Sequence, residues 1–123
     1  MNAGKPSNAT PGLVELRLSG LIDEDSVRSL ISERDHGVAD GVSRWLVHTS
    51  TARIQFDSAR LAGLVESVAE ICPRAHRFRV HVIASDDLNY GCMRMLAAHF
   101  ADTGISVQVY SDADTARGEL LAA

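Results

Sequence analysis

The sequence predicts an α/β domain built on a largely parallel sheet, and three observations lead to this class. Short runs rich in β-branched residues alternate with amphipathic stretches of helical period. The connections between them are short, and 123 residues are enough for one domain with its own core. This alternation is typical of parallel strands whose connecting helices pack on the sheet.

The first predicted strand and helix follow the Pro-Gly pair near the amino terminus. Residues 13–19 alternate apolar and polar side chains, which predicts a strand with one face in water. Such a strand lies at a sheet edge or beside an antiparallel neighbour. We expect Gly20 to end it, and Asp23 to be the N-cap of a helix over residues 24–34.

The second strand and helix are the most regular elements. The run "RWLVHT", residues 44–49, is interpreted as a central strand, followed by a loop that leads to Phe56. In residues 59–72 the apolar positions are spaced by three and four, which predicts a helix with one face in the core. We expect Pro73 to stop this helix because proline cannot continue the hydrogen-bond pattern.

Two further strand–helix pairs complete the predicted order. The remaining elements are strands over residues 78–85 and 105–111 and helices over residues 88–102 and 112–121. Ser85 or Asp86 is the expected cap of the first helix, and Ser111 that of the second. Gly91 is unfavourable in the first turn of a helix, by about 1 kcal/mol relative to alanine. We therefore expect another backbone, a ligand or a subunit to approach Gly91 closely.

The composition is that of a globular protein with no nucleic-acid partner and no transmembrane segment. The net charge of −4 does not suit phosphate binding, and no apolar run is long enough to span a bilayer. Residues 1–12 are interpreted as a flexible leader to a single domain over residues 13–123. Because Cys72 and Cys92 do not make a disulfide framework, we expect a cytoplasmic protein with reduced thiols.

The common catalytic and cofactor motifs are missing. The chain has no glycine-rich dinucleotide loop, no P-loop and no G-x-S-x-G elbow. Cys72, His76 and His81 lie close in sequence but lack a fourth ligand, so we interpret them as a buried thiol and two surface histidines. The sequence therefore predicts no catalytic residue, no metal and no cofactor.

One enzymatic alternative stays open, a small serine hydrolase. His48 falls near the carboxyl end of a central strand, where ligands bind in open α/β sheets, and Asp57 and Ser58 follow across the loop. In this alternative Ser58 is the nucleophile and His48 is its base. The competing interpretation is a structural histidine and a serine that caps the helix.

The stretch "DDLNYGCMRML" brings adaptable apolar side chains to the start of a helix. Leu88, Tyr90 and Met93 are expected to form an exposed surface. Such a surface suits a symmetric homodimer contact or a small apolar ligand.

Two parts of the chain resemble a known family. The strand at residues 44–49 and the helix opening after it resemble the signature of STAS domains of the anti-sigma-factor-antagonist type. The matching positions are Phe56, Asp57, Ser58, Leu61 and Leu64. The carboxyl-terminal part is similar to the SpoIIAA-like branch, also called STAS/SEC14-like, at Tyr110, Asp112 and Ala116. The resemblance covers about residues 13–121.

The resemblance implies a single-domain mixed, mainly parallel sheet of four to five strands, with helices packed mainly on one face and no cofactor. It also implies a first strand that pairs antiparallel, and a regulatory role through protein contacts. Ser58 is the candidate modification site. The family's phosphate acceptor aligns with Ala59 here, however, and the glycine that follows it aligns with Arg60.

We therefore expect a non-enzymatic STAS/SpoIIAA-like domain. It would regulate a protein partner, form a homo-oligomer, or bind a small apolar or amphipathic ligand. The candidate binding residues are His48, Asp57, Ser58, Tyr90 and Met93.

Overall fold

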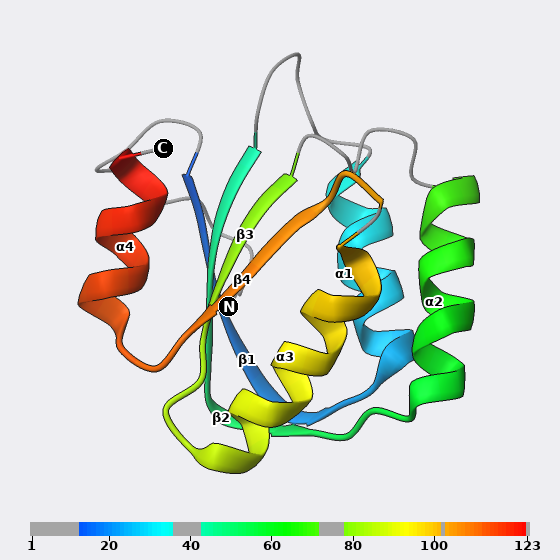
Figure 1. Ribbon diagram of the computed structural model, residues 1–123, viewed down its shortest axis with the longest axis horizontal. Helices are drawn as coiled ribbons and strands as arrows, with labels where there is room; N and C mark the ends of the chain where they lie inside the picture. Colours follow the sequence, from blue (N-terminus) through cyan, green and yellow to red (C-terminus); the bar gives the residue numbers. More distant parts are fainter. Residues whose placement is uncertain (1–12, 36–42, 72–77, 102, 123) are drawn as a thin grey trace.

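The computed structural model describes residues 13–35, 43–71, 78–101 and 103–122 (Figure 1). The strands are β1 (Leu13–Ile22), β2 (Ser43–Ile54), β3 (Phe78–Ile83) and β4 (Ser106–Tyr110). The helices are α1 (Glu24–Asp35), α2 (Ser58–Ile71), α3 (Asp87–Phe100) and α4 (Ala113–Ala122). The predicted α/β class and the alternating order are confirmed. Expectations for residues 1–12, Cys72, Pro73 and His76 lie outside the described residues.

The four described strands form one sheet in the order β1-β2-β3-β4, and every neighbouring pair is parallel. The expected antiparallel pairing of the first strand is therefore wrong. Of the two alternatives predicted for a strand with one face in water, the edge position is confirmed, because β1 is an edge strand of the described sheet. Arg17 and Ser19 are exposed there while Leu16 and Leu18 are buried.

The first two strands are longer than predicted. Gly20 does not end β1, which passes through it with a φ of 74° and continues to Ile22. β2 likewise continues to Ile54, so the predicted loop before Phe56 is mostly strand. Since β3 ends at Ile83, opposite His48, the last part of β2 pairs with β1 alone.

Asn89 of α3 takes the place of the missing strand beside the end of β2. Its side chain is 3% exposed and accepts a hydrogen bond from Ile54 N at 3.3 Å. Its amide nitrogen donates to Thr49 O at 3.2 Å and to Ala52 O at 3.1 Å. These backbone groups would otherwise be unpaired at an unprotected edge. Asn89 thereby fixes the start of α3 against β2.

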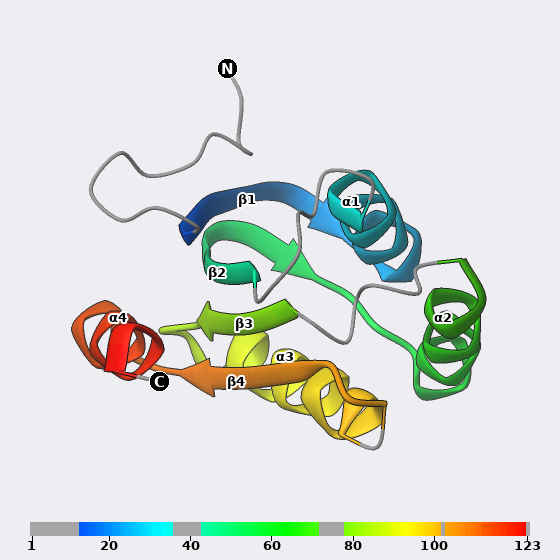
Figure 2. The same ribbon diagram turned by 90° about the horizontal axis from the view of Figure 1, so that it is seen from above.

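Three helices cover one face of the sheet and α4 covers the other (Figures 1 and 2). α1 and α3 lie against the sheet, and α2 packs on α1 and α3. Two apolar cores result, a large one under α1, α2 and α3 and a small one under α4. The expectation that helices pack mainly on one face is consistent with this arrangement.

Aspartates are the N-caps of the helices. Asp23 Oδ1 accepts from Ser26 N, and Asp86 Oδ1 accepts from Asn89 N at 2.8 Å, which confirms both predicted caps. For α4 the cap is Asp112, which accepts from Thr115 N, so the expected Ser111 cap is wrong. Among the described residues, no helix combines the length and the apolarity that crossing a membrane requires.

Candidate functional site

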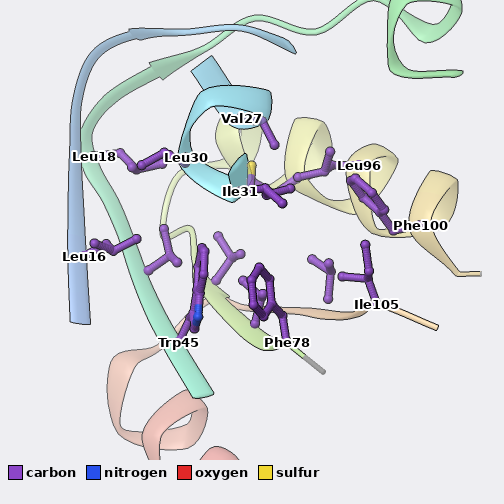
Figure 3. A pocket seen from close by; sticks show the side chains of 15 residues that line it. Leu16, Leu18, Val27, Leu30, Ile31, Trp45, Phe78, Leu96, Phe100 and Ile105 are labelled. Atoms are coloured by element: carbon purple, nitrogen blue, oxygen red, sulfur yellow. The ribbon is translucent and has the colours of Figure 1, made fainter. Parts of the chain in front are cut away.

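The large core contains an apolar cavity of about 60 Å³ (Figure 3). One wall of the cavity is the face of the sheet that α1, α2 and α3 cover. All four strands contribute to this wall. Trp45 and Phe78 lie side by side there, with ring centroids 4.7 Å apart. The fifteen lining side chains belong to Leu, Ile, Val, Met, Phe and Trp. A cavity of this composition stays dry and accepts apolar groups.

The other walls come from α1 and α3. Val27, Leu30 and Ile31 of α1 lie across the cavity from the sheet (Figure 3). Leu96 and Phe100 of α3 close one side (Figure 3). Val27, Leu30 and Ile31 are the apolar residues through which α1 packs in the large core. The cavity therefore lies between α1 and the sheet.

The three residues of the predicted surface on α3 differ in their exposure. Met93 is 4% exposed and lines the cavity, so its place on an exposed surface is wrong, although it does reach an apolar site. Leu88 is 68% exposed. Tyr90 is half-buried, and the Arg94 guanidinium carbon lies 5.9 Å from its ring centroid. A Cβ on Gly91 would meet no atom within 4 Å outside its own helix, so among the described residues no other backbone approaches it closely.

Asp57 and Ser58 form the corner at which α2 begins. Asp57 is the cap, because its Oδ1 accepts from Arg60 N at 3.1 Å. The expectation that Ser58 caps the helix is therefore wrong. Ser58 is exposed in the first turn, and its Oγ lies 3.4 Å from His99 Nε2 on α3. We call these two residues the Asp57–Ser58 corner.

The start of α1 is attached to this corner through a buried acid. Glu24 is 2% exposed, and its carboxylate accepts a hydrogen bond from Asp57 N. Arg60 reaches back to both Glu24 and Asp25, with N···O distances of 3.6 Å. Farther along, Arg28 Nε of α1 donates to Ser67 Oγ of α2. The two helices are thus joined by several polar contacts.

His48 lies on the other face of the sheet. Its Nε2 is 2.7 Å from Glu15 Oε2, and the same oxygen accepts from Arg117 of α4 at 2.9 Å. Partial burial raises the pKa of Glu15, but the hydrogen bonds and positive charges of His48 and Arg117 outweigh it and hold the pKa below its ordinary value. The structure therefore brings His48 to Glu15, whereas Ser58 contacts His99.

His81 also faces α4, and it is not the surface residue that was predicted. It is 6% exposed, its Nδ1 donates to Ala116 O, and its ring packs beside that of Tyr110. Among the described residues no cluster of three or more metal-ligating side chains is present.

Comparisons with protein-family models, with curated proteins and with solved structures find no match for this chain.

Sequence reasoning missed Glu24, Asn89 and the cavity itself. Glu24 carried one signal, since an acid in the first turn of a helix favours an interaction with backbone amides. Asn89 lies three residues after the Asp86 cap, in a helix whose other buried residues are apolar. A polar residue at that position is a weaker signal of a buried hydrogen-bonding role. The cavity depends on the spacing between α1 and the sheet, which no sequence pattern encodes.

Proposed function

We propose that this protein is a non-enzymatic binding domain of STAS/SpoIIAA-like type that takes a small apolar molecule into its cavity. The observation that carries the proposal is the lining, in which every one of the fifteen side chains is apolar. Met93, a candidate ligand residue from sequence, is one of them. Apolar pockets between helices and a sheet are common sites for small ligands.

The two internal methionines provide the test. Met93 lines the cavity, whereas Met95 packs against the core without lining it. With ¹³C-labelled methionine methyl groups, benzene should shift the Met93 signal in a saturable way and leave Met95 nearly unchanged. Native mass spectrometry of the purified protein should also find a carried apolar molecule. If benzene shifts neither methyl, the proposal fails.

A matched variant separates binding from nonspecific effects. Val47 and Val82 both line the cavity, and replacing both by isoleucine adds carbon to it. The double variant V47I/V82I should lose the benzene-induced shift of Met93 while keeping the fold. An equal shift in wild type and double variant would place benzene elsewhere.

A regulatory role through protein contacts is the second part of the proposal. It is supported by the exposure of Ser58 at the Asp57–Ser58 corner, in the place where the resemblance expects a contact or modification site. We propose that the protein acts in the cytoplasm, where a free thiol such as Cys92 stays reduced.

The hydrolase alternative has less support. Ser58 and His48 belong to different faces of the sheet, and the 3.4 Å contact with His99 is at the long limit for a hydrogen bond. Among the described residues no acidic side chain holds His99 in place. We expect the protein to remain unlabelled by a fluorophosphonate probe. Labelling that disappears in Ser58→Ala would restore the alternative.

A further inference from the structure

The cavity is smaller than most apolar ligands. An enclosed apolar cavity of about 150 Å³ accepts benzene, whereas this one has about 60 Å³. A single atom such as xenon needs less room than a benzene ring. Because the cavity is partly open, a ligand of benzene size or larger is fully enclosed only if one wall moves outward.

Two of the walls are held in place. The sheet wall is tied by parallel hydrogen-bond ladders between all neighbouring strands. α3 is fixed at its start by the three hydrogen bonds of Asn89 to β2 and by the Asp86 cap. Displacing either wall would leave buried backbone groups unpaired, which is unfavourable.

α1 meets the sheet through apolar side chains, so it is the wall that moves in this proposal. Its inward residues Val27, Leu30 and Ile31 meet the sheet across the cavity (Figure 3). The polar side chains of its first turns contact α2 and its cap instead. Glu24 accepts a hydrogen bond from Asp57 N, and Arg28 donates one to Ser67. Movement of α1 away from the sheet would therefore carry α2 with it.

The contact that such a movement would break lies at the Asp57–Ser58 corner. Ser58 belongs to the first turn of α2, and its partner His99 belongs to the fixed α3. Their contact is exposed and 3.4 Å long, so it is a weak hydrogen bond. The acid that joins α1 to this corner, Glu24, is buried.

We infer that the cavity and the Asp57–Ser58 corner are coupled: a ligand larger than the cavity displaces α1 together with α2, and this separates Ser58 from His99. The inference rests on the proposed ligand function. In the closed state the cavity is small and Ser58 contacts His99; in the open state the cavity is wider and both side chains are free for a protein partner. A ligand favours the open state only because it fits that state better.

Two probes of different size test the coupling by NMR. Xenon should shift the Met93 methyl signal while leaving the Ser58 amide and His99 imidazole signals unchanged. Benzene should shift all three with one common saturation curve. If benzene shifts Met93 but neither Ser58 nor His99, the coupling is overturned and the ligand function stands. If neither probe shifts Met93, the ligand function fails and the coupling fails with it.

Two variants test whether Glu24 couples α1 to the Asp57–Ser58 corner. Glu24→Ala removes the acceptor of Asp57 N and the partner of Arg60, and should lower the benzene-induced shift at Ser58 at least twofold with the Met93 shift retained. Because Glu24 is buried and its loss could impair folding, Arg60→Met provides a second, exposed substitution with the same expected direction. The matched control is Arg94→Met on α3, which should leave both shifts as in wild type. Equal Ser58 shifts in wild type, Arg60→Met and Arg94→Met would contradict the proposed path.

Discussion

The two faces of the sheet are packed in different ways. Under α4 the core is small and its residues are closely covered: Leu13, Leu46 and Leu120 are at most 1% exposed, and Ala116 is fully buried. Arg117 and the backbone of α4 also receive polar partners from the strands. On the opposite face a much larger apolar core still contains a cavity. The cavity therefore lies on the face that α1, α2 and α3 cover, and this is the face on which we propose that a ligand binds.

The largest expected effect concerns the fixed wall of the cavity face. Asn89→Ala leaves Ile54 N, Thr49 O and Ala52 O without their partner. Since each buried unpaired group costs about 1–3 kcal/mol, we expect the free energy of unfolding to fall by roughly 4 kcal/mol. Urea denaturation measures it. Leu88→Ala, an exposed neighbour, is the control and should change stability by less than about 0.5 kcal/mol.

The next effect compares the two faces directly by adding carbon to each. Ala116→Leu overfills the α4 face and should lower the free energy of unfolding by about 2 kcal/mol. Val82→Ile adds a methyl group to the cavity face, and because the space is vacant it should be neutral or stabilise by up to about 0.8 kcal/mol. Equal destabilisation by both substitutions would show that the two faces are packed equally well.

A smaller effect concerns the polar contacts that hold α4. Because the folded-state pKa of Glu15 is lowered, its stabilising contribution is present above the ordinary value of 4.5 and is lost as pH falls through the folded pKa. Glu15→Gln should therefore be less stable than wild type at neutral pH, by up to about 1 kcal/mol. The difference in stability between wild type and Glu15→Gln should become smaller as the pH falls below 4.5. Urea denaturation across this range checks it, and a gap that widens toward low pH would contradict the assignment.

The smallest effect concerns the outer side of α3. Gly91 lies inside the helix, and a Cβ at this position would meet no atom within 4 Å outside its own helix. Gly91→Ala should therefore raise the free energy of unfolding by about 0.5 kcal/mol. Gly20→Ala is the opposite control, since its φ of 74° disfavours any side chain. Thermal denaturation should show the two shifts with opposite sign. Destabilisation by Gly91→Ala would mean that something does approach α3 there.

Much of the fold could be predicted from the sequence because strand and helix periods are local. The helix that begins after Asp57 is predictable nearly to its ends, since its apolar spacing is regular. The end of β2 could not be predicted, because residues 51–54 become a strand only when β1 and Asn89 supply hydrogen-bond partners from afar. The edge position of β1 was one of two alternatives, and only the pairing itself decides between parallel and antiparallel.

The candidate site was less accessible to sequence reasoning. Met93 was identified as a ligand residue, but the helix pattern did not show that it points into the core. His48 and Ser58 are ten positions apart, and the sequence offers no way to see that Glu15 and His99 are their partners. Because crossovers between parallel strands are right-handed, the strand order β1-β2-β3-β4 places α1, α2 and α3 on one face. No such rule sets the face of α4, which follows the last strand.

The measurement that tests the central claim most directly is a benzene titration of the methionine-methyl-labelled protein and of V47I/V82I. We predict a saturable shift of Met93 in wild type, a nearly unchanged Met95, and no Met93 shift in the double variant. A wild-type Met93 signal that does not move, or one that moves equally in both proteins, would contradict the claim that the cavity is a binding site.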